Sequence, residues 1–230
     1  MASVTTAQMI IDDAESILQD TDNNRWSEAE HLLAVNNGSK EICLFKPDAY
    51  VVSESVELSA GPVQSLPDGG YQLQNITHNM GTDGSTPGKA IRLLDQRVLD
   101  SMDENWRTAT PSSVVDYYIY DERVPLEFQV SPPQPASNFG HVWMSYCKSP
   151  PEIAIGETIL IPDIYRSVLL DYVLYCAFKK DADQPGNAQR AIAHYQAFLN
   201  ALGERRNVEA IEDPNVKSSV TKYEIPPNLR

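Results

Sequence analysis

The stretch "RWSEAEHLLAVNNGSKEICLFKPDAY", Arg25 to Tyr50, decides how the chain is organised. Ser27 and Glu30 have the S-x-x-E spacing of a capping box, in which both side chains bond backbone N–H groups at a helix start. Trp26 precedes the cap, where an apolar side chain packs against the first turns. Pro47 disfavours the α conformation at Lys46, so the helix should end there. A helix therefore precedes Pro47, and a different pattern follows it.

The middle of this helix carries the polar run Asn36, Asn37, Gly38 and Ser39. A glycine inside a helix costs about 1 kcal/mol relative to alanine. Close packing against another helix would offset this cost, as would a face of Asn36, Asn37 and Ser39 turned to a polar partner. The residues alone leave both interpretations open.

Helical patterns occupy both ends of the chain. Thr5 and Gln8 predict a capping box for a first helix, whose apolar residues follow the i, i+3, i+4 pattern. Pro162 suits the first helical position of "PDIYRSVLLDYVLYCAFKK", which is apolar on most sides from Val168 onward, as in the central helix of a bundle. A last apolar stripe consists of Ala188, Ala191, Ile192, Tyr195, Phe198, Leu199 and Leu202.

Between these helices the pattern changes to short alternating runs such as "YQLQNITHNM", "VVDYYIY", "LEFQV" and "HVWMSYC". They predict antiparallel strands separated by turns. We expect "LDQRVLDSMDENW" to form a short helix and "SPPQPASNFG" to join two hairpin strands. The predicted fold class is α+β: a helical bundle of two N-terminal and two C-terminal helices (1–48 and 157–206), an inserted antiparallel β module (49–156) and an extended C-terminal arm (207–230).

The arm has no periodicity that would build a core of its own, yet it carries spaced apolar residues, namely Val216, Val220, Tyr223, Ile225 and Leu229. Either it is plainly disordered, or it is extended and becomes ordered on a partner.

The net charge of −14 argues against a protein that grips nucleic acid, because such binding neutralises phosphates with clustered Lys and Arg. The first sixty residues alone carry eleven acidic and three basic side chains. We expect neither a secretion signal nor a membrane span, since no apolar run reaches about 18 residues. Cys43, Cys147 and Cys176 lie far apart in apolar runs and are expected to be reduced, buried thiols.

Motifs for catalysis are incomplete, and we expect no enzyme activity, metal or cofactor. "GSTPGKA" has one residue too few between its glycines for a phosphate-binding loop and lacks the Ser or Thr that would hold magnesium. Glu28 and His31 are half of a di-iron motif, without a second half, so we interpret His31 as a surface or interfacial histidine. A hydrolase built on two of the 32 acidic residues stays open, because so many carboxylates allow many pairings.

Aromatic residues offer one further alternative. Tyr117, Tyr118, Tyr120 and Trp143 could form a platform for carbohydrate or peptide in a monomeric binding protein. Alternating aromatic residues are also what a half-buried strand favours, so core packing is the simpler interpretation.

Five runs of the sequence occur in the same order as in the head-to-tail adaptor (connector) family of tailed bacteriophages, particularly the short-tailed type. They are "RWSEAEHLLAVNNGSKEICLFKPDAYV", "SLPDGGYQLQNITHNMG", "AIRLLDQRVLDSMDENW", "YIYDERVPLEFQVSPP" and "LLDYVLYCAFKKDA". The chain resembles this family over about residues 5 to 203.

The resemblance implies a structural subunit that forms a ring, typically of twelve, with portal protein above, tail nozzle or tail tube protein below and double-stranded DNA passing through. It places the protein in the virion neck, assembled in the host cytoplasm. Trp26, Asn36, Asn37, Gly38 and Ser39 then become candidates for a subunit interface. The arm, with Val216, Val220, Tyr223, Ile225 and Leu229, becomes the candidate portal contact.

Overall fold

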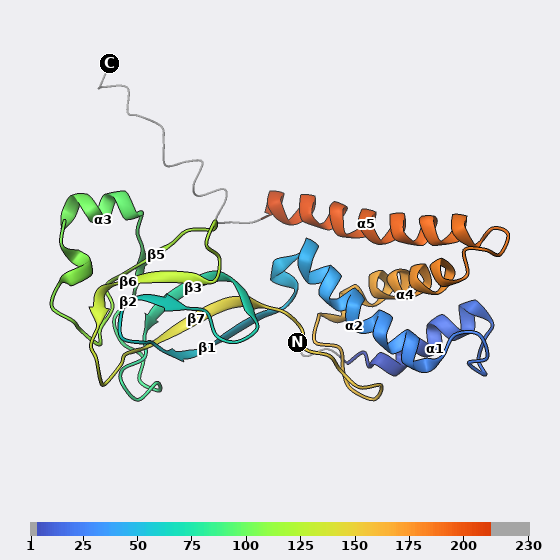
Figure 1. The fold of residues 1–230 in the computed structure, drawn as a ribbon, viewed down its shortest axis with the longest axis horizontal. Helices are drawn as coiled ribbons and strands as arrows, with labels where there is room; N and C mark the ends of the chain where they lie inside the picture. Colours follow the sequence, from blue (N-terminus) through green and yellow to red (C-terminus); the bar gives the residue numbers. More distant parts are fainter. Residues whose placement is uncertain (1–3, 213–230) are drawn as a thin grey trace, which may run out of the picture. The chain divides into compact units, whose positions relative to one another are not determined.

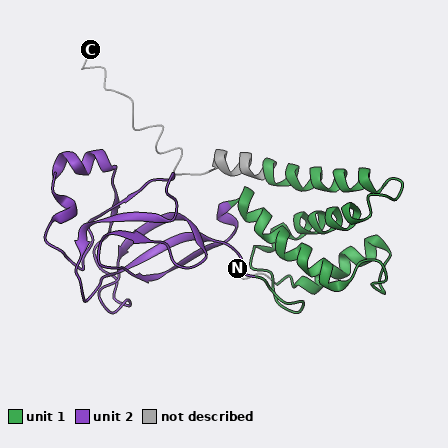
Figure 2. Cartoon of the chain, viewed as in Figure 1, with its two compact units in different colours: residues 1–46, 152–230 green, residues 47–151 purple. Residues whose placement is uncertain are grey.

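The computed structural model describes residues 4–212, which form two compact units (Figure 1, Figure 2). Unit 1 combines residues 1–46 with the chain from residue 152 onward, and unit 2 is the continuous segment 47–151. From the sequence, these borders are expected at 48/49 and 156/157. Helices and strands occur together, so the fold is α+β.

Unit 1 contains α1 (Ala7–Leu18), α2 (Glu28–Phe45), α4 (Arg166–Lys180) and α5 (Asn187–Glu212). α4 is in contact with each of the other three helices, which makes it the central helix. Its start differs from the prediction, because a 3-10 turn at Asp163–Tyr165 follows Pro162 and α4 begins only at Arg166. α5 also runs past residue 206, so residues 207–212 are helical and do not belong to an extended arm.

The start of α1 is bonded to the chain that returns from unit 2. Its N-cap is Thr6 and not the predicted Thr5, whose own N–H donates to Asp163 Oδ1 at 2.9 Å. The N–H groups of Ala7 and Gln8 donate to carbonyls of the segment 155–157 at 3.0 and 2.9 Å. Because the first N–H groups of a helix have no partner within the helix, this segment satisfies them and belongs with unit 1.

α2 begins with the predicted capping box. The Glu30 N–H donates to Ser27 Oγ at 3.4 Å, and the Ser27 N–H donates to Glu30 Oε2 at 2.9 Å. The indole N–H of Trp26 donates to the Ala177 carbonyl of α4 at 3.0 Å, and Lys180 of α4 binds Glu30 Oε1 at 2.6 Å. The cap of α2 thus also attaches this helix to α4.

Unit 2 contains two sheets. In the first the strand order is β1 (Val51–Glu57), β7 (His141–Lys148), β3 (Gly70–Asn79). In the second it is β2 (Gly61–Ser65), β6 (Glu127–Gln134), β5 (Tyr117–Tyr120), β4 (Arg92–Leu93). The predicted short helix is α3 (Gln96–Met102), and 3-10 turns lie at Pro47–Ala49 and Trp106–Thr108.

Apolar side chains of both sheets share one core, which holds the sheets face to face. Its buried residues include Leu73, Ile76, Tyr118, Phe128, Val130, Val142, Met144 and Tyr146. A smaller cluster of Leu99, Trp106 and Ile119 lies beneath α3. Since alternate residues of β5 enter the two clusters, this strand is covered on both faces.

Two details of the predicted β module are wrong. β6 and β7 lie in different sheets and are not the two strands of a hairpin, because β6 continues through Pro132 and Pro133 to Gln134 and pairs with β2 and β5. The short β4 pairs in parallel with β5, so the module is antiparallel except at this edge.

The cap of α2 predicts a specific pH dependence. The hydrogen bond from Lys180, followed by those from the Ser27 N–H and hydroxyl, lowers the pKa of Glu30 to about 2. A carboxyl with a lowered pKa stabilises the fold above its unfolded pKa of about 4.3, and this contribution disappears as the pH falls toward 2. Glu30→Gln should therefore lower the urea midpoint at pH 7 and lose this effect near pH 2.

Urea unfolding followed by circular dichroism at several pH values measures this difference. Glu28→Gln is the matched control, because it removes a charge from the same turn and leaves the capping box intact. A difference in urea midpoint between Glu30→Gln and wild type that is equally large at pH 7 and pH 2 would contradict the lowered pKa of Glu30.

Candidate functional site

Gly38 lies at a very close approach of α2 to α4. A Cβ atom at this position would lie 2.5 Å from Leu169 Cδ1 and 2.8 Å from Tyr172 Cδ1. Both distances are far inside the ordinary van der Waals separation of about 3.5–4.0 Å between carbon atoms. The glycine therefore permits close helix packing, and the partner helix belongs to the same chain.

The polar neighbours of Gly38 are also occupied within unit 1. Asn36, which is 8% exposed, donates from Nδ2 to the Ile153 carbonyl at 3.1 Å and accepts the Ile153 N–H at 3.0 Å. The Ser39 hydroxyl donates to the Val35 carbonyl at 2.9 Å. These bonds satisfy buried polar groups that would otherwise destabilise the unit.

The five candidate interface residues thus separate into two groups. Trp26, Asn36, Gly38 and Ser39 are buried, whereas Asn37 is exposed. The polar face expected for Asn36 and Ser39 is turned inward, since their partners Ile153 and Val35 lie within the subunit. A role of these five residues at a subunit interface stays a prediction, and Asn37 is the one among them whose side chain is exposed.

The aromatic residues of the β module do not gather on one surface. Tyr118 and Tyr120 belong to the core between the sheets, and Tyr117 packs against the cluster beneath α3. Trp143 lies on β7 in the other sheet, where it stacks on His78 with ring centroids 6.3 Å apart. Core packing accounts for the tyrosines, and the four rings form no common platform.

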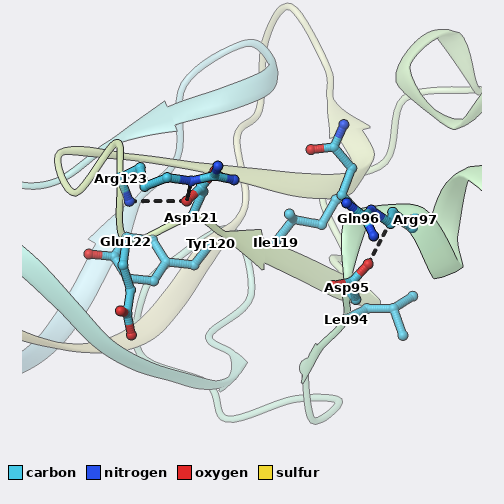
Figure 3. A pocket seen from close by; sticks show the side chains of 9 residues that line it. All are labelled: Leu94, Asp95, Gln96, Arg97, Ile119, Tyr120, Asp121, Glu122 and Arg123. Carbon is cyan, nitrogen blue, oxygen red and sulfur yellow. Dashed lines mark hydrogen bonds and ion pairs between the residues drawn. The ribbon is translucent and has the colours of Figure 1, made fainter.

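An open hollow of about 750 Å³ lies where β5 ends beside the start of α3 (Figure 3). Its lining is mostly polar: the Asp95 carboxylate accepts the backbone N–H of Arg97 at 2.8 Å, and Asp121 binds the Arg123 guanidinium at 2.9 and 3.0 Å. Arg123 holds the pKa of Asp121 below its usual value. An ionised carboxylate of this kind is unsuited to the general-acid step of a hydrolase.

The partial motifs of the sequence have structural roles. In the loop "GSTPGKA", the Lys89 ammonium pairs with Asp116 at 2.6 Å. His31 is 2% exposed, which corrects its interpretation as a surface histidine, and burial lowers its pKa. Within residues 4–212 we find no group of three His, Cys, Asp or Glu side chains able to hold a metal ion.

The three cysteines are thiols outside any disulfide: Cys43 and Cys147 are buried and Cys176 is half-buried. Burial raises the pKa of the Cys147 and Cys176 thiols. A raised pKa disfavours the thiolate, which is the nucleophilic form.

The candidate portal residues Val216, Val220, Tyr223, Ile225 and Leu229 lie outside the described residues. In the described part of the chain, no helix has the length and apolar character needed to cross a membrane.

A family model described as the SU10 adaptor protein matches residues 5–219, which covers parts of both units. The chain belongs to this family of phage head-to-tail adaptors. A search of curated proteins finds no significant match.

Membership makes the protein a structural phage adaptor, associated with portal and tail proteins at the virion neck, and implies a role without catalysis.

Sequence reasoning missed the partners that bury the middle of α2. Ile153 is separated from Asn36 by 117 residues, and the segment around it has no helical or strand pattern. One sequence signal could have indicated this contact: an Asn in the middle of a helix, followed two residues later by a glycine, in a chain that also has an apolar central helix for α2 to pack against.

The Gly38 contact yields a stability prediction. Gly38→Ala should lower the free energy of unfolding by about 1–3 kcal/mol, because the added Cβ overpacks against Leu169 and Tyr172. Urea denaturation measures the change. Gly203→Ala is the matched control, since Gly203 is also helical but has no atom within 4 Å of an added Cβ, and it should stabilise by up to about 1 kcal/mol. Equal effects of the two substitutions would show that Gly38 has no packing role.

Proposed function

We propose that the protein forms a dodecameric ring at the head–tail junction, between the portal and the tail nozzle, and that double-stranded DNA passes through the ring during genome ejection. The observation that carries this proposal is the family match over residues 5–219, which includes parts of the helical unit and of the inserted β unit. Assembly takes place in the host cytoplasm, and the β unit faces the tail. The protein acts through surfaces and needs no cofactor.

The acidic composition supports passage of DNA without specific binding. The chain carries 32 acidic and 18 basic side chains, a net charge of −14. A channel wall with the same sign of charge as DNA does not retain the duplex, whereas basic rings would hold it through counterion release.

The portal contact is assigned to the C-terminal segment. Residues 213–230 follow the end of α5 and contain all five spaced apolar residues of the predicted arm. Fixing an extended backbone costs about 1–2 kcal/mol per residue, so such a segment needs a partner surface that repays the ordering. The portal ring is that partner.

Mixing the purified chain with its cognate portal ring tests the ring directly. Light scattering coupled to size exclusion should give a complex whose added mass equals twelve chains, while the chain alone stays smaller if the portal templates assembly. A wild-type chain that adds no mass to the portal, or adds only one or two copies, would contradict the proposal.

Removal of the C-terminal segment tests the portal contact. A chain that ends at Glu212 should keep the cooperative unfolding of the full chain, because both described cores remain, but it should lose attachment to the portal. The matched control is the full-length chain with serine at positions 216, 220, 223, 225 and 229, which keeps the length and removes the apolar side chains. Attachment of both variants at wild-type affinity would move the contact to another surface.

A further inference from the structure

The outward side of α5 has no charge over more than three turns. From Ala191 to Gly203 the chain contains no Asp, Glu, Lys or Arg, in a protein with 22% charged residues. Ala191, Phe198 and Leu202 are buried on the inward side. The residues on the opposite side are all exposed, and we call them the α5 outer face: Ile192, Ala193, Gln196, Ala197, Asn200 and Gly203.

A second face of the same kind lies on α2. Ala29, Leu33, Asn37 and Leu44 are exposed and follow each other along one side of the helix, and we call them the α2 outer stripe. Leu33 is 56% exposed and Leu44 is 71% exposed. Lys40 lies within this stripe, between Asn37 and Leu44, and pairs with Glu152 at 3.0 Å, so it contributes little net charge. Glu30 and Glu41 flank the stripe, and Glu30 is paired with Lys180.

Net charge limits which surfaces of this chain can meet those of a second copy. Two copies of charge −14 repel each other, and like charges across an interface oppose association. The centres of protein interfaces are accordingly depleted of Asp, Glu and Lys. The α5 outer face meets this condition, and the α2 outer stripe meets it apart from Lys40, whose charge is paired with that of Glu152.

The two faces also complement each other in shape. Three of the six residues of the α5 outer face, Ala193, Ala197 and Gly203, are small, so a helix can approach closely at these positions. The α2 outer stripe presents projecting leucines that can fill the shallow surface. Helices pack at interaxial distances of about 8–10 Å, and the distance depends on the side chains at the contact.

We infer that the α2 outer stripe of one copy packs on the α5 outer face of the next copy, with Asn37 near the centre of the contact. The inference rests on the proposed ring and names its subunit contact. α2 and α5 both pack on α4 (Figure 1), and the residues of their outer faces are exposed. Two different faces joined in this way make a head-to-tail contact, which gives a ring where the rotation between neighbouring copies closes, whereas a face that pairs with itself gives a dimer.

Cross-linking of portal-bound protein tests this pairing. The full chain with both Asn37→Cys and Gln196→Cys, bound to portal and treated with a short bismaleimide, should give a ladder of linked chains that extends beyond dimers. Each single substitution and the wild type should give no ladder. The control combines Gln196→Cys with Ser16→Cys, which is exposed on α1 outside both faces, and it should also give no ladder.

Two charge substitutions give a second readout. Leu33→Glu and Ala197→Glu replace exposed side chains, so circular dichroism should show unchanged unfolding, but the yield of portal-bound ring should fall at least about ten-fold because acidic faces then oppose each other. Ser16→Glu adds the same charge outside both faces and should assemble like wild type.

A wild-type ring in which the double-cysteine chain gives no ladder would overturn this inference and leave the ring intact. Linked dimers from Asn37→Cys alone would also overturn it, because they would show that the α2 outer stripe pairs with itself. A wild type that forms no ring on the portal would instead remove the proposed function together with the inference.

Discussion

The close approach of α2 to α4 at Gly38 determines the arrangement of the helical unit. Because no Cβ fits between Gly38 and the side chains of Leu169 and Tyr172, the two backbones can come closer there than ordinary side chains allow. The same orientation buries Val35 and Ile42 on the inward side. It leaves the α2 outer stripe on the opposite side, so one glycine helps decide which α2 residues stabilise the subunit and which are open to partners.

The same helix also fixes the point at which the chain re-enters the helical unit after unit 2. Asn36, two residues before Gly38, binds Ile153 by two hydrogen bonds and so fixes the returning segment on α2. Within unit 2 the first and last strands are neighbours, with Val51 paired to Cys147. An insertion whose ends lie side by side adds little loop-closure cost to the host unit, and each unit has a core of its own.

Local signals explain what could be predicted from the sequence. The capping box of Ser27 and Glu30 and the stop at Pro47 depend on residues that are close in the chain, and both ends of α2 were therefore predictable. The inward turn of Asn36 and Ser39 was not, because α2 is buried over a wide arc and the partner of Asn36 is distant in sequence. The end of β6 was also missed, since prolines inside a strand are normally a sign of its end.

The same reasoning applies to the candidate site. A mid-helix glycine indicates close packing, but the sequence does not say whether the partner belongs to the same chain; only Asn37 of the five candidates was left exposed. The tyrosines of β5 were predicted to be core residues, and Tyr118 is one because alternate residues of a strand face opposite sides.

Strong acidity and ring assembly are compatible if uncharged surface is confined to narrow faces. A surface that is acidic elsewhere keeps single copies apart and soluble, since like charges repel. Two helical faces of a few residues each make a weak contact, so an isolated pair of copies has little to hold it together. In the proposed ring each copy would be held by two such contacts and by the portal, and its release would require all of them to break together. Simultaneous engagement of several weak contacts raises the overall affinity steeply. Under the proposed function, a subunit of this kind would therefore remain dispersed until the portal ring brings its copies together.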